Sequence, residues 1–199
     1  MNNGKQGTWK VKVGKLRDYR VKCWKSGKYR YKLKIELIDS TPTREILVIM
    51  LNPSDADEKE NNFDPTCRFL INICHSNGYD YITICNLFSL ITKDVKVLGQ
   101  NIQQANDNQN INEIKNYIGG FNEILCAWGG PYKEIKNKKI LNDRIKEVLE
   151  ILKSQKSKGK EILKLKFDKK DRELYPPHPQ GKDLNTEFEP YCIERININ

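Results

Sequence analysis

The strongest constraint on the fold is an alternation of short apolar segments with longer amphipathic ones. The apolar segments have the length of single buried strands and cover residues 45–51, 80–88, 121–130 and 161–167. Three of the intervening segments have a helical pattern, at residues 64–78, 106–120 and 132–155. This order predicts an α/β domain, a three-layer sandwich in which helices cover both faces of a mostly parallel sheet of about four strands.

The segment before the first apolar run has a different pattern. Residues 17–38 alternate polar and apolar side chains around a Lys-Ser-Gly-Lys turn, which is typical of a β-hairpin. A chain of 199 residues is long enough to bury one hydrophobic core. We therefore predict one domain over residues 1–199. It has a hairpin extension at 1–40, a core at 41–180 and a tail at 181–199 that contains a candidate edge strand.

The chain carries an excess of positive charge. It has 35 lysine and arginine residues against 26 aspartate and glutamate residues, which gives a net charge of +9. A basic surface favours polyanions, and among these nucleic acid first. No stretch approaches the ~20 consecutive apolar residues that span a bilayer, and the first residues lack an apolar leader. We expect a cytoplasmic protein without membrane contact.

Six cysteines raise the question of disulfides or a metal site. Their spacing contains no Cys-x-x-Cys pair, and two of them, Cys85 and Cys126, lie inside apolar strand segments. Buried cysteine behaves as a small hydrophobic residue. The expectation is that these side chains pack in the core and that no metal is bound.

Polar and small residues follow the predicted strands. In open α/β sheets, ligands bind beyond the carboxyl ends of the strands. The segments leaving these ends are Asn52-Pro53-Ser54, Asn86-Leu87-Phe88, Trp128-Gly129-Gly130 and the loop that carries His178. We therefore predict that these four segments meet at one site.

Two asparagines and one histidine are the leading candidates within this site. Asn52 either caps a turn before Pro53 or presents a fixed amide that positions water or a ligand. Asn86 ends a buried strand, and a buried amide needs hydrogen-bond partners, which suits reading the edge of a base. His178 lies on a loop stiffened by prolines. It is either a surface residue or a donor of a proton or hydrogen bond to a developing anion.

An acidic segment follows the first strand exit. Asp55 and Asp57 belong either to a solvated loop or to a site in which they act as acid–base groups or cation ligands. Asp64 is a natural N-cap for a helix in which Pro65 occupies the first position.

Glycines and lysines supply candidate phosphate contacts. Gly129 and Gly130 either let the chain turn or expose backbone N–H groups at the start of the long helix, where a phosphate binds readily. Lys133 and Lys182 are further candidates for contact with phosphate or with a nucleic-acid backbone. The spacing matches no established phosphate-binding loop.

Several short motifs resemble one known family. The segments GKYRYKLKI, LVIMLNPSDADE, FDPTCRF and NGYDYITICNLFSL closely resemble domain of unknown function 1643, an uncharacterised bacterial and phage family. Its later motifs, an Asn-Asp pair, an Ala-Trp-Gly turn and a His-Pro pair, are matched at Asn106-Asp107, Ala127–Gly129 and His178-Pro179. The resemblance covers most of residues 28–180 in order, and the family name itself implies no function.

A more distant resemblance does imply a function. The order of parts is similar to the uracil-DNA glycosylase superfamily, particularly its mismatch-specific branch. Its catalytic turn, base-reading strand end, Trp-Gly segment and closing His-Pro loop resemble Leu51–Ser54, Ile84–Asn86, Cys126–Lys133 and His178–Gln180. Gln180 replaces the usual serine, and the usual water-activating aspartate is absent unless Asp55 or Asp57 substitutes.

This resemblance implies a role for each matching residue. Asn52 would position the attacking water, Asn86 would read the flipped base, and His178 would stabilise the departing base anion. The remaining contacts to the base would come from Pro53, Ser54 and an aromatic face supplied by Phe63 or Phe88. No metal or organic cofactor would be required.

Two hypotheses of different classes follow. The first is a glycosylase-like enzyme that flips a modified or unmodified base of DNA, or binds a nucleotide, and hydrolyses the N-glycosidic bond. The alternative is a binding module of the same fold without turnover, for example one acting in phage–host conflict. A metal-dependent hydrolase that uses Asp55 and Asp57 is a third and weaker alternative.

Overall fold

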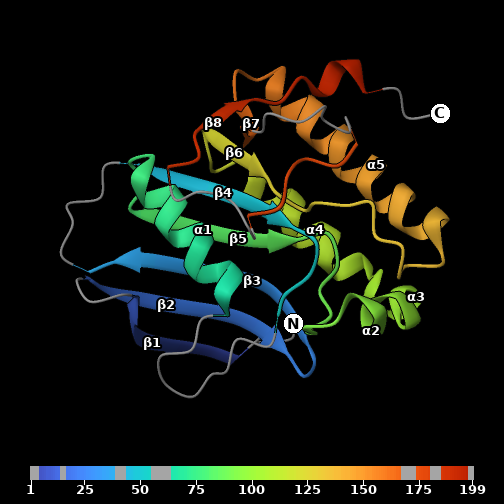
Figure 1. Ribbon diagram of the computed structural model, residues 1–199, viewed down its shortest axis with the longest axis horizontal. Helices are drawn as coiled ribbons and strands as arrows, with labels where there is room; N and C mark the ends of the chain where they lie inside the picture. Colours follow the sequence, from blue (N-terminus) through green and yellow to red (C-terminus); the bar gives the residue numbers. More distant parts are fainter. Residues whose placement is uncertain are drawn as a thin grey trace.

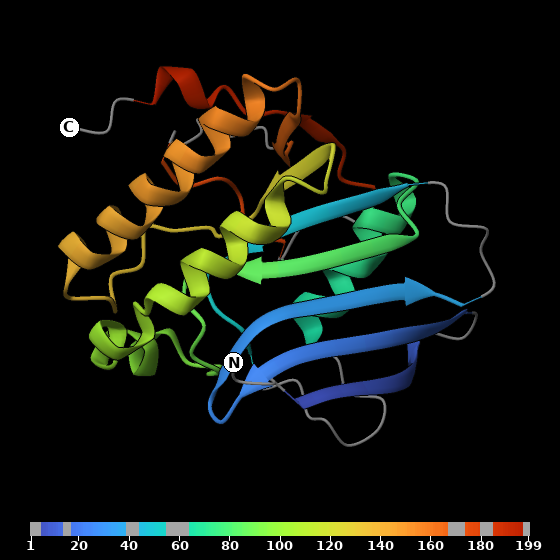
Figure 2. The same ribbon diagram turned by 180° about the vertical axis from the view of Figure 1, so that it is seen from behind.

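The computed structural model describes residues 5–13, 17–38, 44–54, 64–166, 174–179 and 185–196, with side chains described from residue 19 onward. Within these ranges the chain forms one eight-stranded sheet with helices on both faces (Figures 1 and 2). The strand order is β1-β2-β3-β5-β4-β6-β7-β8. The strands are β1 (Lys5–Val13), β2 (Arg17–Ser26), β3 (Tyr29–Leu37), β4 (Glu45–Met50), β5 (Tyr81–Asn86), β6 (Glu123–Cys126), β7 (Glu161–Leu165) and β8 (Phe188–Pro190).

The centre of the sheet is parallel and its two sides are antiparallel. β5, β4, β6 and β7 run parallel to one another, whereas β3 joins β5 and β8 joins β7 in antiparallel fashion. The α/β class and the N-terminal hairpin are confirmed, but the sheet is larger and more mixed than predicted. The difference arises because β3 pairs directly with the core strand β5, with Leu33 opposite Ile84. β1 and β8 then extend the two sides.

Helices form the outer layers. α1 (Pro65–Ser76) covers one face of the sheet, and α4 (Asn108–Ile118) and α5 (Lys138–Lys156) cover the other (Figures 1 and 2). Two short helices that the sequence pattern did not indicate, α2 (Val95–Gln100) and α3 (Ile102–Ala105), connect β5 to α4. A single 3-10 turn, η1 (Ile193–Arg195), follows β8 and contacts α5.

The central strand β4 connects two hydrophobic clusters. Ile46 and Val48 belong to the cluster on the α1 side, whereas Leu47 and Ile49 belong to the cluster beneath α4 and α5. All four are fully buried, because a strand in the middle of a covered parallel sheet has no solvated face. This packing explains the continuous apolar run in the sequence and holds the turn after β4 on a rigid base.

Helix boundaries follow local capping. The Asp64 carboxylate accepts hydrogen bonds from the N–H groups of Thr66 and Cys67, so α1 starts where the sequence predicted. α5 starts at Lys138, six residues later than predicted, because Asn137 caps it by accepting from the N–H of Ile140. The segment before it crosses the end of β6 as an irregular connection.

Five of the six cysteines are buried and Cys192 is exposed; none of the six forms a disulfide. Burial strongly raises the pKa of the Cys67, Cys74 and Cys126 thiols, so these groups stay protonated and pack as apolar side chains. In the described part of the chain, no helix has both the length and the apolar surface needed to cross a membrane.

Candidate active site

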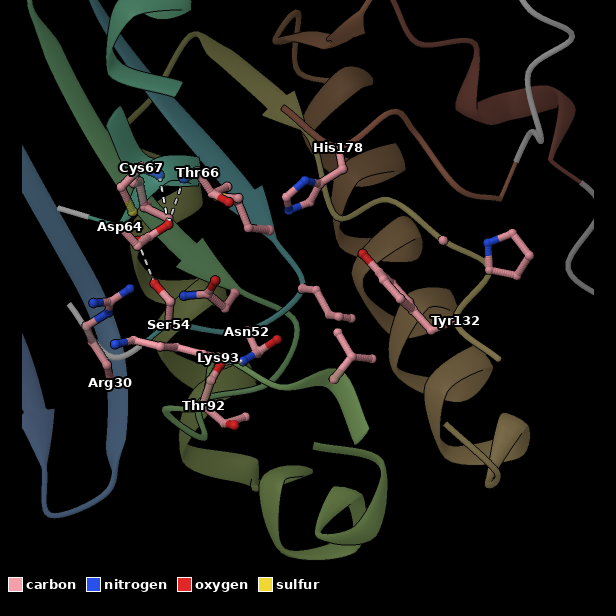
Figure 3. A pocket seen from close by; sticks show the side chains of 17 residues that line it. Arg30, Asn52, Ser54, Asp64, Thr66, Cys67, Thr92, Lys93, Tyr132 and His178 are labelled. Carbon is pink, nitrogen blue, oxygen red and sulfur yellow. Dashed lines mark hydrogen bonds between the residues drawn. The ribbon is translucent and has the colours of Figure 1, made fainter. Parts of the chain in front are cut away.

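A cavity of about 420 Å³ lies at the carboxyl ends of β4 and β5 (Figure 3). Its walls come from segments far apart in the sequence: β3, the turn after β4, the start of α1, the loop at residues 92–95, and the segments that carry Gly130 and His178. This is the edge of the sheet at which the sequence predicted a site. The volume is within the ~300–1,000 Å³ of ordinary small-molecule sites.

Asn52 both holds the turn after β4 and faces the cavity. Its Nδ2 donates hydrogen bonds to the carbonyl oxygens of Thr92 at 2.8 Å and Pro53 at 3.0 Å. These bonds orient the amide and join the turn to the loop that follows β5. No donor among the described residues contacts Oδ1 of Asn52, so a fixed acceptor is what the side chain can present to a ligand or water.

Asn86, at the end of β5, has an unsatisfied amide. The side chain is only 1% exposed and lines the cavity, yet its Nδ2 has no hydrogen-bond partner among the described residues. A buried donor left without a partner is unfavourable and uncommon in folded proteins. The amide therefore has an unused donor at a position where the residue lines the cavity.

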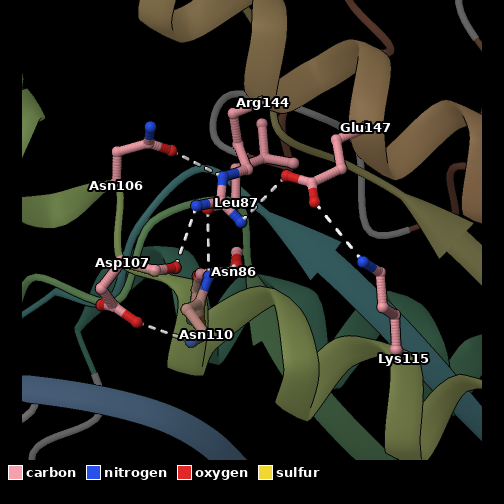
Figure 4. A network of polar contacts seen from close by, with 8 residues as sticks. All are labelled: Asn86, Leu87, Asn106, Asp107, Asn110, Lys115, Arg144 and Glu147. Carbon is pink, nitrogen blue, oxygen red and sulfur yellow. Dashed lines mark hydrogen bonds and ion pairs between the residues drawn. The ribbon is translucent and has the colours of Figure 1, made fainter.

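A polar network behind Asn86 holds the end of β5 in place (Figure 4). Nδ2 of Asn110 on α4 donates to the carbonyl oxygens of Asn86 at 2.8 Å and Leu87 at 3.0 Å. The Asp107 carboxylate accepts from the Asn110 N–H at 2.6 Å and from the Ser89 hydroxyl. The backbone around Asn86 is thus fixed by a helix that packs on the opposite side from the cavity.

Arg144 of α5 completes the network. It is 3% exposed and donates from Nε to Oδ1 of Asn106 at 2.8 Å and from a terminal nitrogen to the Asp107 carbonyl oxygen at 3.0 Å. Its other terminal nitrogen lies 3.5 Å from the Glu147 carboxylate. These contacts give the Asn-Asp pair of the sequence motif a structural role in joining α4, α5 and the end of β5.

The loop that carries His178 docks against the end of β6. The Trp128 indole N–H donates to the Leu174 carbonyl oxygen at 3.1 Å, and the Gly129 N–H donates to the Pro176 carbonyl oxygen at 2.9 Å. Gly129 has φ +68°, and a Cβ on it would lie 2.8 Å from the Cβ of His178. The glycine is therefore needed both for its backbone conformation and for the close approach of the histidine.

His178 is a neutral imidazole at physiological pH. Burial disfavours the charged form and lowers the pKa to about 4, although the ionised Asp64 nearby acts in the opposite direction. A neutral imidazole donates one N–H to a ligand without carrying a positive charge. Figure 3 shows His178 on the other side of the cavity from Ser54 and Asp64.

The Asp64 carboxylate caps the start of α1. Burial by itself would raise the pKa of this carboxyl group, but hydrogen bonds from Ser54, Cys67 and Thr66 outweigh it and hold the pKa below its usual value. The Ser54 hydroxyl donates to Oδ2 at 2.5 Å, while Oδ1 caps the helix. Asp64 therefore lines the cavity as an ionised, fully engaged carboxylate.

The structure brings together only some of the predicted site residues. Asn52, Ser54, Asn86, Gly130 and His178 line the cavity. The residues that fall outside the described ranges are Asp55, Asp57, Phe63 and Lys182.

The other predicted residues do not line the cavity. Phe88 is fully buried in the core under α4 and α5, where it cannot offer a ring face to a base. Pro53 is buried and its carbonyl oxygen accepts from the Thr92 N–H at 2.9 Å. Gly129 packs against His178, and Lys133 is exposed on the connection to α5.

Several cavity residues were not singled out from the sequence. These are Arg30 on β3, Thr66 on α1, Thr92 and Lys93 after β5, and Tyr132 after β6. Tyr132 donates its hydroxyl hydrogen to the Trp128 carbonyl oxygen and so supports the His178 loop. Arg30 stands in the Tyr-Arg-Tyr motif, but the sequence alone did not place it at the predicted site. Its location became clear only from the pairing of β3 with β5.

Comparison with known proteins identifies one family. No curated protein and no solved structure matches the chain. The family described as "Protein of unknown function (DUF1643)" matches residues 30–180, which include all of β3 but its first residue, the cavity-forming turns and His178. This range is most of the 199-residue chain, and the protein therefore belongs to the DUF1643 family.

Proposed function

We propose that this protein is a glycosylase-like hydrolase that binds a modified or unmodified base of DNA, or of a nucleotide, in the cavity and cleaves its N-glycosidic bond. The observation that carries the proposal is that Asn52, Asn86 and His178, from three distant segments, line one cavity. Asn52 offers a fixed acceptor for the attacking water, and Asn86 offers an unsatisfied amide donor for the edge of the base. His178 offers a neutral imidazole for the departing base anion.

Recognition of the base would fall to Asn86. A base in a duplex must leave the stack before an enzyme can reach its glycosidic bond, and the flipped base is read along its hydrogen-bonding edge. The free Nδ2 of Asn86 would donate to a carbonyl oxygen or ring nitrogen of that edge. The network behind Asn86 would keep the amide at a constant position during this reading.

Cleavage would use Asn52 and His178 together. A water held by Oδ1 of Asn52 would attack the anomeric carbon as the bond from that carbon to the base nitrogen breaks. The electron pair of that bond moves onto the base, and the proton of the attacking water is lost to solvent or to the departing base. The His178 N–H would stabilise the base anion by a hydrogen bond, which becomes stronger as charge develops.

One observation favours the non-catalytic alternative. Among the described cavity residues the carboxylate is that of Asp64, and its oxygens are occupied by Ser54 and by the start of α1. A carboxylate in that state is poorly placed to activate water. A module that binds a base or nucleotide without turnover would use the same cavity and the same Asn86.

A gel assay separates the two functions. The substrates are labelled single- and double-stranded oligonucleotides with uracil, mismatched, hydroxymethylated or glucosylated bases, and alkali reveals abasic sites. We expect cleavage by the wild type and by the control His75→Asn on α1. Asn52→Ala and His178→Asn should each be about 10²–10³-fold slower, as for loss of one transition-state contact. Binding without cleavage of any substrate would establish the binding module instead.

A further inference from the structure

Arg30 is a buried cation without a partner in the described structure. It lies near the start of β3, is 4% exposed and lines the cavity. Its backbone N–H bonds the Ser89 carbonyl oxygen at 2.8 Å, which fixes the strand. Its guanidinium forms no hydrogen bond or ion pair with any described residue, and Nε is completely buried without an acceptor.

The other two buried cations of the described chain, Arg144 and Lys32, both have partners. Arg144 has Asn106, the Asp107 carbonyl and Glu147 around its guanidinium. The ammonium of Lys32 lies 3.8 Å from the centre of the Trp24 ring and 3.3 Å from that of Tyr117. A buried charge is strongly unfavourable unless it is paired, so Arg30 calls for an anion that the described residues do not supply.

A second cation lies on the same wall. Lys93, in the loop after β5, lines the cavity, and Figure 3 shows its side chain extending toward Arg30. The hydroxyl of Thr66 is on the cavity wall as well. Asp64 adds one negative charge to this cavity, but its oxygens accept from Ser54 and from the N–H groups of α1, and it forms no ion pair with Arg30 or Lys93.

We infer that Arg30 and Lys93 form a subsite for the phosphate group of a nucleotide. Guanidinium binds phosphate oxygens through parallel N–H donors, and a second cation suits the double charge of a phosphate monoester. His178 lies across the cavity from this wall in Figure 3. A nucleotide whose base is bound by Asn86 would thus direct its phosphate toward Arg30. This inference deepens the proposed function and rests on it for the identity of the base.

The test measures binding and needs no turnover. Isothermal titration compares the 5′-monophosphates of deoxyuridine and the four common deoxynucleosides with the matching unphosphorylated nucleosides. A short single-stranded oligonucleotide forms a separate arm, which distinguishes a free nucleotide from one within a strand. Arg30→Met removes the charge but keeps the length of the side chain. Arg20→Met, on the neighbouring strand β2 and 44% exposed, is the matched control for loss of one positive charge.

We expect at least one monophosphate or the oligonucleotide to bind about 10- to 100-fold more weakly to Arg30→Met, as for loss of one charged hydrogen-bond partner. Arg30→Lys should recover part of the loss, and Arg20→Met should match the wild type. Without ligand, Arg30→Met should unfold at the same or a higher temperature, because an unpaired buried charge has been removed. A purely structural arginine would lower that temperature.

Three results would overturn the inference: equal binding of nucleosides and monophosphates, equal binding by Arg30→Met and the wild type, or no binding of any probe by the wild type. The results also distinguish a failure of this inference from a failure of the proposed function. Phosphate binding that depends on Arg30, without cleavage of any oligonucleotide or nucleotide, would keep the subsite and reject the glycosylase. Full cleavage activity in Arg30→Met would keep the glycosylase and reject the subsite.

Discussion

Replacing Gly129 with alanine should displace His178. Gly129 has φ +68°, and a Cβ at this position would lie 2.8 Å from both the Cβ of His178 and Oη of Tyr132. The Cβ of His178 is next to the backbone, so the overlap can be relieved only by moving the loop itself. A non-glycine residue in this backbone region costs about 1–3 kcal/mol, and the displacement adds to that.

His178 itself reports the displacement. The chain has two histidines, so NMR shows two imidazole Cε1–H signals, which His75→Asn assigns. In the wild type, burial holds the pKa of His178 at about 4. In Gly129→Ala we expect the pKa to rise toward the ~6.5 of a solvated imidazole. Any cleavage should fall about 100-fold, because a misplacement of about 1 Å is sufficient for that loss.

Gly159→Ala is the matched control. Gly159 has φ +83°, but a Cβ there would meet nothing within 4 Å. It carries the same backbone penalty of about 1–3 kcal/mol without touching the site. If both variants lose equal stability while His178 of Gly129→Ala still titrates near its wild-type value, the glycine serves only the turn and the docking argument is wrong.

Three further predictions concern stability, measured by urea unfolding. Because the pKa of His178 is lowered to about 4, an unfolded chain takes up a proton between pH ~6.5 and 4 that the folded chain does not. The free energy of unfolding should fall by up to about 3 kcal/mol over that range, and His178→Gln should flatten the fall. Asn110→Ala should lose about 1–3 kcal/mol and weaken base binding, whereas the exposed Asn108→Ala should change stability by less than about 0.5 kcal/mol. Asp64→Ala should lose about 1 kcal/mol at neutral pH. Since the pKa of Asp64 is lowered, that deficit should shrink as the pH falls through its folded-state value, and a deficit independent of pH would contradict the capping role.

The parts of the fold that could be predicted are those with local signals. The start of α1 follows from Asp64 and Pro65, whose capping preferences act within one helical turn. The parallel centre of the sheet follows from apolar runs that have no solvated face. The position of Asn52 at a strand exit follows from the same local pattern.

The parts that could not be predicted depend on contacts between distant segments. The pairing of β3 with β5 joins residues about fifty positions apart, and no feature of the hairpin alone indicates it. Arg30 enters the cavity only through this pairing. The late start of α5 depends on the Tyr132–Trp128 contact and on capping by Asn137, which compete with a helical pattern that continues further upstream.

Arg30 and Asn86 together define the proposed ligand more closely than either does alone. Each is almost completely buried, each has donor groups without a partner in the described structure, and both line the same cavity. A chain under selection for stability alone would carry an apolar residue at both positions, because a buried group without a partner weakens the fold. The two requirements differ in kind: Asn86 needs a neutral acceptor, and Arg30 needs an anion. A single molecule satisfies both if a flat acceptor edge and a phosphate are joined across a cavity of about 420 Å³, and a nucleotide is such a molecule.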